Sequence, residues 1–261
     1  MIGVGISGYG YWGSNLARSV AETDGARLTA IADFSTAALA RAGKRYPAAR
    51  LVESWRDLLD DPDIDAVIIA TPVSSHFEIA LAALRKGKHV LVEKPITDRS
   101  SEARMLIEEA ARRGLTLMVD HTFVYTGAVR KIGELISSGD LGEIFYYDST
   151  RVNLGLFQRD VNVIWDLAVH DLSILDFLLA AKPSAVSASS TIHIRGSLEN
   201  MAHLTLFYPG GTAAHLNVNW LAPVKVRQTL IGGSRKMIVW NDLEPSEKIK
   251  VYDRGVSVGD D

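Results

Sequence analysis

The sequence predicts an α/β protein with two domains, an N-terminal doubly wound parallel sheet and a C-terminal α+β domain with an open, mostly antiparallel sheet. Three observations support this prediction. Strand-like and helix-like segments alternate over the first 120 residues. The strict alternation stops after about residue 121, and from about residue 183 several strand-like segments follow one another. We therefore place the first domain at residues 1–120 and the second at residues 121–261.

The strands of the first domain are predicted from short apolar runs rich in β-branched residues, as expected for buried parallel strands. These runs are IGVGIS, LTAIAD, DAVIIAT, HVLVEK and LTLMVD. Helices are expected between them, at about 12–22, 36–46, 76–86 and 100–113. In a sheet of this kind, ligands bind beyond the carboxyl ends of the strands.

The second domain is predicted from a different succession of elements. A helix around 127–138 is expected to end at Gly139, and the strand FYYDSTRV follows it. The run VIWDLAVHDLSILDFLL predicts a mostly apolar helix. The segment HLTLFYPGGTAAHLNVNW predicts a hairpin that turns at Pro-Gly-Gly, with His215 and Asn217 on one face and Leu216 and Val218 on the other.

Composition narrows the range of partners. With 47% hydrophobic and 23% charged residues, the chain is an ordinary globular sequence. A net charge of −3 and the lack of any Lys/Arg-rich block argue against nucleic acid and anionic membranes, so small-molecule partners are expected. There is no cysteine, no export signal at the N-terminus and no long apolar run, so we expect a soluble protein in the cytoplasm. No set of His, Asp and Glu has metal-ligand spacing, so no metal is expected.

A glycine-rich loop directly follows the first strand and opens a helix, which predicts a pyrophosphate site at the helix N-terminus. The cofactor contacts predicted in this loop are Gly8, Gly10, Tyr11, Trp12 and Gly13. Plain packing is the alternative for Tyr11 and Trp12. Asp33 ends the second strand, where a carboxylate accepts a hydrogen bond from a ribose 2′-hydroxyl and repels a 2′-phosphate, so NAD is favoured over NADP. A structural turn with a helix-capping aspartate is the alternative.

Two further segments are expected at the same edge of the sheet. One is Thr71-Pro72, followed by His76, which either lines the nicotinamide pocket or caps a helix. The other is Glu93-Lys94 followed by proline, which restricts the backbone and makes a cis bond affordable. On position alone, Lys94 could be a solvated charge at a strand end.

The apolar helix of the second domain carries a narrow polar line. On a helix of 3.6 residues per turn, Asp166 and His170 lie about 40° apart, and Ser173 falls on the same stripe. Residues 161–181 contain no Lys, Arg or Glu, which a water-facing side normally carries. The line is therefore interpreted as facing a ligand, with a solvated stripe as the alternative. His121, which begins the second domain, either reaches the substrate or is a core histidine.

The motifs GYGYWG, ATPVSSH and VEKP occur in that order and are followed by an Asp-xxx-His pair on a helix. With these motifs the chain resembles the Gfo/Idh/MocA family, named after glucose-fructose oxidoreductase and inositol dehydrogenase, from residue 2 to about 240. The resemblance implies an N-terminal Rossmann domain and a C-terminal domain with an open antiparallel sheet. It also implies NAD(P)-dependent hydride transfer to or from a secondary alcohol or ketone of a sugar, cyclitol or nucleotide sugar.

The resemblance places the family's catalytic residues on Lys94, Asp166 and His170. We interpret His170 as the acid/base, Lys94 as the electrostatic partner of the developing oxyanion, and Asp166 as an orienting residue or substrate ligand. The stretch TRVNLGLFQ resembles a subgroup acting on sugars, which places Arg151 and Asn153 at the substrate pocket.

Alternatives to a dehydrogenase are a non-catalytic dinucleotide-binding regulator and a SAM-binding methyltransferase. The alternating strands of the second domain suggest a sheet face left for another subunit, so we expect a homo-oligomer, either a dimer or a tetramer. Family members are longer and end with a further strand and a long helix, whereas this chain stops at DRGVSVGDD. We therefore expect either a truncated chain or a shortened variant.

Overall fold

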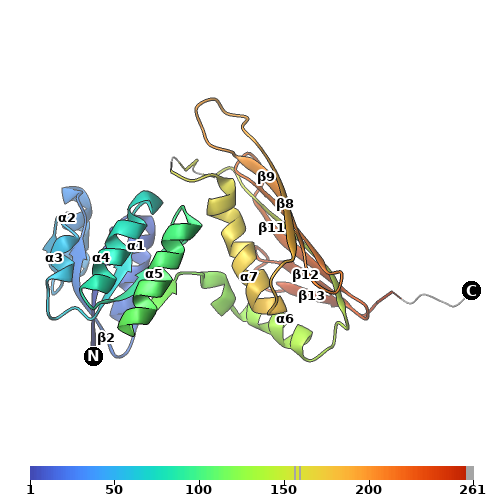
Figure 1. Cartoon of the computed structure of the whole chain (residues 1–261), viewed down its shortest axis with the longest axis horizontal. Coiled ribbons are helices and arrows are strands. Elements are labelled where there is room, and N and C mark those ends of the chain that lie inside the picture. The colour runs from blue at the N-terminus through green and yellow to red at the C-terminus, as the bar shows by residue number, and fades with distance from the viewer. Residues whose placement is uncertain (156, 159, 257–261) are drawn as a thin grey trace, which may run out of the picture. The chain divides into compact units, whose positions relative to one another are not determined.

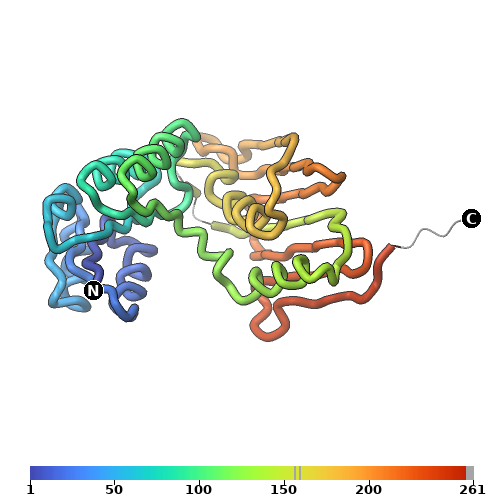
Figure 2. The backbone as a smooth tube through the Cα atoms, turned by 60° about the horizontal axis from the view of Figure 1, so that its bottom comes forward, coloured from blue at the N-terminus to red at the C-terminus, as the bar shows by residue number. Residues whose placement is uncertain are grey.

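The computed structural model describes residues 1–155, 157–158 and 160–256. Position 156 of the TRVNLGLFQ stretch and positions 257–261 of the terminal DRGVSVGDD thus lie outside the described residues. The chain divides into two compact units, Met1–Asp120 and His121–Asp261. Each unit is built on its own sheet (Figure 1, Figure 2).

The first unit is a six-stranded parallel sheet in the order β3-β2-β1-β4-β5-β6. The strands are β1 Ile2–Ser7, β2 Ala26–Ala32, β3 Arg50–Val52, β4 Ala66–Ile69, β5 His89–Val92 and β6 Leu117–Val119. Five of them match the apolar runs, which confirms the parallel α/β prediction. The short strand β3 was missed because its three residues, Arg-Leu-Val, are exposed or half-buried and form no apolar run.

Helices cover both faces of this sheet, which makes it doubly wound. The helical segments are α1 Tyr11–Glu22, α2 Thr36–Arg45, α3 Arg56–Leu59, η1 Val73–Ser75, α4 His76–Arg85 and α5 Ser100–Arg113. Buried side chains of α1 and α2 join one hydrophobic cluster, and those of α3, α4 and α5 join another. Helix α5 ends where Gly114 adopts a left-handed conformation with φ 66°, which favours glycine over other residues.

The second unit is a seven-stranded sheet in the order β13-β12-β11-β7-β10-β9-β8. Its strands are β7 Ile144–Val152, β8 Ala185–Thr191, β9 Met201–Phe207, β10 Ala213–Asn219, β11 Val226–Gly233, β12 Met237–Asn241 and β13 Ile249–Tyr252. Only the β7–β10 pair is parallel among these neighbours. The predicted hairpin is confirmed as β9–β10, with Leu216 and Val218 buried and His215 exposed.

Helices cover one face of the second sheet (Figure 1). They are η2 Thr122–Tyr125, α6 Gly127–Ser137, η3 Ile164–Ala168 and α7 Val169–Leu179. Side chains from α6 and α7 pack on inward-facing residues of the sheet such as Tyr147, Leu216 and Ile231. Among the described residues, no helix has both the length and the apolar character needed to cross a membrane.

The predicted helix around Asp166 is not a regular α-helix, so the 3.6-residue geometry assumed for it was wrong. Its first part, η3, is a π-helical turn, and the α-helix begins only at Val169. The side chain of Asn162 accepts hydrogen bonds from the backbone N–H groups of Ile164 and Trp165, which fixes the entry into this wide turn. Single π-helical turns occur often at functional sites.

Candidate cofactor and catalytic site

The glycine loop between β1 and α1 is shaped by two glycines and left open by a third. Gly8 has φ +94°, and a Cβ there would lie 2.6 Å from the carbonyl oxygen of Ala70. A Cβ on Gly13 would lie 1.9 Å from the carbonyl oxygen of Gly8. A Cβ on Gly10 would meet nothing within 4 Å. The loop is therefore packed at its base and open at Gly10, the N-cap of α1, where backbone N–H groups attract an anion.

Asp33 braces this loop. Its Oδ2 accepts a hydrogen bond of 2.7 Å from the backbone N–H of Tyr9, and its Oδ1 accepts one of 2.8 Å from that of Ser35. Ser35 in turn caps α2 by accepting from the N–H of Ala38. The carboxylate therefore ties the glycine loop to the start of α2, and each oxygen keeps a lone pair for a ligand.

A cavity of about 390 Å³ opens beside Asp33 at the carboxyl ends of β1, β2 and β4. Its lining includes Gly8, Gly10, Asp33, Thr71 and Pro72, as predicted from sequence, and also Phe34, Arg41, Glu53 and Trp55, which were not predicted. The volume of the cavity, and the free space beside Gly10, suit one half of a dinucleotide, so the residues present fit NAD(P). Tyr11 and Trp12 are 78% and 49% exposed and pack edge to face on each other, outside the residues that line the cavity.

His76 ties together two loops of the first unit. Its imidazole is fully buried, with Nδ1 2.9 Å from the carbonyl oxygen of Pro95 and Nε2 2.9 Å from that of Thr71. The Lys94–Pro95 bond is cis. The ring therefore holds the Thr71-Pro72 loop and the Lys94-Pro95 loop at a set separation.

Glu93 lies beside Lys94 at the end of β5 and is a buried carboxyl. Its Oε2 accepts a hydrogen bond of 3.2 Å from the backbone N–H of Lys94. Burial, and after it the charge and hydrogen bond of Asp120, raise the pKa of Glu93 to about 7, although Lys94 acts in the opposite direction. Near neutral pH this carboxyl therefore changes its charge.

We predict that Glu93→Gln flattens the pH dependence of stability. A carboxyl whose pKa rises from 4.5 to about 7 on folding stabilises the folded chain below pH 4.5, and this contribution is lost as pH rises through about 7. Urea unfolding from pH 5 to 8.5 should show wild type losing more stability than Glu93→Gln. The control is Glu108→Gln, on the exposed side of α5, which should follow wild type. Parallel curves for Glu93→Gln and wild type would contradict the prediction.

The predicted pair of the second unit lies on consecutive turns, with both side chains half-buried. Asp166 Oδ2 accepts a hydrogen bond of 2.9 Å from Trp220 Nε1. The imidazole of His170 packs edge to face on Phe123, with ring centroids 5.0 Å apart. Ser173 donates to the backbone oxygen of His170 and does not extend the polar line. The arrangement holds a carboxylate and an imidazole partly open to solvent, on a helical segment that contains no Lys, Arg or Glu.

Of the three residues predicted to contact the substrate, two are partly exposed and one is buried. His121 is half-buried and precedes η2, and Asn153 follows β7 with its N–H donating to the carbonyl of Asn219. Arg151 is only 3% exposed, and its Nε lies 2.8 Å from Oδ2 of Asp171, which is fully buried. Burial lowers the pKa of Arg151, but the adjacent Asp171 carboxylate outweighs this effect and raises it.

Sequence reasoning missed Asp171, although a signal for it exists. Alternation along FYYDSTRV places Tyr147, Ser149 and Arg151 on the same inward face, and such a polar row needs a buried partner. Asp171 is that partner, since it accepts from Ser149 Oγ at 2.7 Å, from Tyr147 OH at 3.2 Å and from Arg151. Within the described part of the chain, no group of three His, Cys, Asp or Glu side chains could hold a metal ion.

Comparison with known proteins places both units in one family. The model "Oxidoreductase family, NAD-binding Rossmann fold" matches residues 2–121, and the model "GFO/IDH/MocA C-terminal domain" matches residues 129–239. The uncharacterized oxidoreductase YdgJ of Escherichia coli (strain K12) is 30% identical over 260 residues, which cover 95% of this chain and 73% of that protein.

Two further matches extend the comparison. The scyllo-inositol 2-dehydrogenase (NAD(+)) of Bacillus subtilis (strain 168) is 28% identical over 197 residues, which cover 74% of this chain but only 56% of the relative. A crystal structure from Magnetospirillum magnetotacticum MS-1 superposes with a TM-score of 0.86 at 29% identity, covering 100% of this chain and 87% of the other. The chain therefore belongs to the Gfo/Idh/MocA family of oxidoreductases, with an N-terminal NAD-binding Rossmann domain.

Proposed function

We propose that this protein is an NAD(P)-dependent dehydrogenase or reductase that acts on a secondary alcohol or ketone of a sugar, cyclitol or nucleotide sugar. The observation that carries the proposal is the half-buried Asp166–His170 pair on a segment that contains no Lys, Arg or Glu, in a chain whose other unit has a cavity that suits half of a dinucleotide. The inositol dehydrogenase among its relatives supports a polyhydroxylated substrate.

The proposed catalytic residues have different tasks. The nicotinamide, when bound, supplies or accepts the hydride. His170 takes the hydroxyl proton during oxidation and returns it during reduction, because an imidazole titrates near neutral pH. Asp166, held by Trp220, binds a substrate hydroxyl or orients the imidazole. Lys94 stabilises the negative charge that develops on the substrate oxygen. His121 and Asn153 shape the substrate pocket, whereas Arg151, buried in its ion pair with Asp171, is a core residue and not a substrate ligand.

The proposed reaction is tested with purified protein, NAD or NADP, and a panel of polyols, cyclitols, sugars and nucleotide sugars, followed at the NADH absorbance. At least one substrate should be turned over, and Lys94→Ala should abolish most of that turnover. The alternative is a regulator that binds NADH without chemistry. That alternative is favoured if NADH binds but wild type and Lys94→Ala are equally inactive on the whole panel.

We propose NAD as the preferred cofactor because Asp33 lines the cavity and each of its carboxylate oxygens can accept a further hydrogen bond, here from a ribose hydroxyl. Asp33→Ala should weaken NADH binding by about 10- to 100-fold, the loss of one hydrogen bond to a charged group. It should weaken NADPH binding less, because the repulsion of the 2′-phosphate disappears together with the carboxylate. Fluorescence titration of both cofactors measures this. If NADH and NADPH binding weaken equally, Asp33 does not select between the two cofactors, and its role is limited to its hydrogen bonds with the backbone of Tyr9 and Ser35.

We also propose a homo-oligomer that uses the uncovered face of the second sheet. On this face, His203, Thr205, His215 and Asn217 of neighbouring strands line a shallow depression of about 400 Å³ together with Asp148. Light scattering on the purified protein should give at least twice the 28.5 kDa chain mass.

A further inference from the structure

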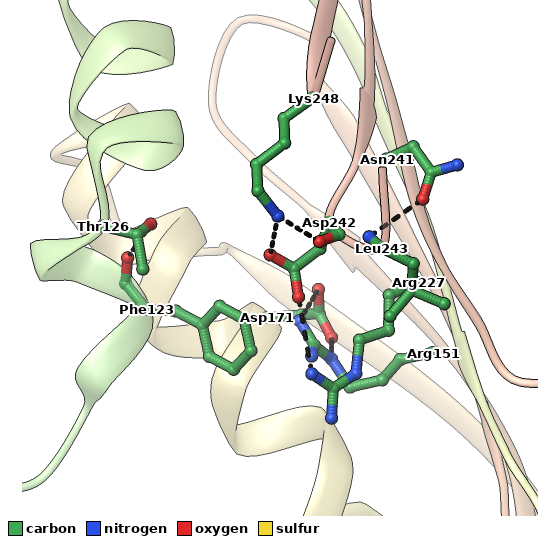
Figure 3. Close-up of polar contacts among 9 residues, drawn as sticks. All are labelled: Phe123, Thr126, Arg151, Asp171, Arg227, Asn241, Asp242, Leu243 and Lys248. Carbon is green, nitrogen blue, oxygen red and sulfur yellow. Dashed lines mark hydrogen bonds and ion pairs between the residues drawn. The ribbon is translucent and has the colours of Figure 1, made fainter. Parts of the chain in front are cut away.

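Phe123 touches the proposed acid/base and two guanidinium groups at once. Its ring lies 5.0 Å from the His170 ring, at an interplanar angle of 68°. The Cζ atoms of Arg151 and Arg227 lie over the same ring, 4.5 and 5.7 Å from its centroid. Figure 3 shows the ring of Phe123 directed toward this charged cluster, which also contains Asp171 and Asp242. All these groups belong to the second unit.

The inner part of the cluster is anchored in the core. Arg151 and Asp171 are ion-paired and almost entirely buried. Arg151 Nη1 is buried and has no hydrogen-bond acceptor among the described residues, so the π face of Phe123 is the electron-rich group that covers this guanidinium. The guanidinium of Arg151 and the ring of Phe123 therefore hold each other in place.

Arg227, the second guanidinium group over the ring, is held by an ion pair of its own. Arg227 Nη1 lies 3.4 Å from Oδ2 of Asp242, and Lys248 Nζ lies 3.6 Å from its Oδ1 (Figure 3). The backbone of Phe123 is also held, because Thr126 Oγ1 donates a hydrogen bond of 2.7 Å to its carbonyl oxygen. Phe123 is thus fixed at both its main chain and its ring.

These contacts form a closed cycle around His170. Asp171 follows His170 in the chain and accepts a hydrogen bond from Arg151. The Arg151 guanidinium lies over the Phe123 ring, and this ring contacts the imidazole of His170. A histidine χ2 angle has no sharp intrinsic preference, so an outside contact has to define the ring plane. An acid/base must be held within about 10–20° of its productive orientation.

We propose that Phe123, held by the guanidinium groups of Arg151 and Arg227, is a positioning residue that sets the orientation of the His170 imidazole. The proposal rests on the proposed function of His170. A plain packing role for Phe123 is the competing reading, since the ring also packs near Trp240 at 6.5 Å. Packing alone predicts that leucine, which is also apolar, leaves His170 in place.

The test uses the full chain labelled with ¹³C,¹⁵N-histidine, without cofactor or substrate, and compares wild type with Phe123→Leu, Phe123→Tyr and Phe177→Leu. The His170 signals are identified by their loss in His170→Gln, and the other histidine signals report that the fold is intact. Phe177, half-exposed on α7, is the matched control. Loss of the Phe123 ring current shifts nearby signals by itself, so the criterion is the χ2 angle of His170, measured from the three-bond couplings of its Hβ atoms to ring Nδ1 and Cδ2. We expect these couplings to change in Phe123→Leu and to stay near wild type in Phe123→Tyr and Phe177→Leu. Unchanged couplings in Phe123→Leu overturn the proposal.

Turnover separates this proposal from the proposed function. With a substrate found in the panel, Phe123→Leu should lower kcat by about 10- to 100-fold with little change in KM, as expected when a catalytic group is misplaced. Phe123→Tyr should recover most of this loss. If the His170 χ2 couplings change while kcat stays at the wild-type value, the positioning by Phe123 stands and the acid/base role of His170 is wrong.

Discussion

Replacing His170 with alanine is expected to lower kcat by a factor of about 10²–10⁴, the usual contribution of a general acid/base. The imidazole is half-buried beside Phe123, and without it the substrate proton has to pass to water or to a weaker base. Cofactor binding should change little, because the cavity proposed for the cofactor belongs to the first unit. Initial rates over a full substrate range separate kcat from KM.

Two companion variants sharpen this experiment. His170→Gln keeps a hydrogen-bonding side chain but cannot titrate near neutral pH, so it should lose nearly as much activity as the alanine variant. His193→Ala removes an exposed histidine from the same unit and should retain wild-type turnover. A loss of less than about tenfold in His170→Ala, against the range expected for an acid/base, would assign proton transfer to another group.

Arg151→Met is expected to destabilise the protein by about 3–5 kcal/mol, the usual cost of breaking a buried ion pair from one side. The variant leaves the Asp171 carboxylate at 0% exposure, with hydrogen bonds from Ser149 and Tyr147 but without its cation. Adding Asp171→Asn removes the stranded charge and keeps an acceptor for Ser149. The double variant should therefore be more stable than Arg151→Met alone, and urea unfolding of wild type, Arg151→Met, Asp171→Asn and the double variant gives the coupling energy.

An exposed pair provides the contrast. Lys131 and Glu134 on α6 lie 3.1 Å apart, with side chains 58% and 68% exposed, so Lys131→Met should change stability by no more than about 0.5 kcal/mol. If Arg151→Met also stays within about 1 kcal/mol of wild type, well below the cost of a stranded buried charge, then the interior pair is hydrated in solution and does not anchor Phe123.

The local pattern of the sequence predicted most elements because their periodicity is strong. Alternation along TAAHLNVNW gave the correct hairpin faces, and apolar β-branched runs located five strands of the first sheet. Strand β3 was missed because pairing with β2, not its own composition, makes it a strand. The π-helical turn at Asp166 was missed because apolar periodicity does not register the hydrogen bonds from backbone N–H groups to the Asn162 side chain, and because Trp220 is 54 positions away from Asp166.

The sequence by itself determined the two-domain α/β organisation, the glycine loop with its acid, and the candidates Lys94, Asp166 and His170, since each follows from short-range spacing or from motif order. Only the tertiary structure decided that His76 links two loops, that Asp33 braces the glycine loop, and that Asp171 and Arg151 form a buried pair covered by Phe123. These contacts join residues 5 to 28 positions apart in the sequence, and their strength depends on burial, which strand pairing and helix packing create.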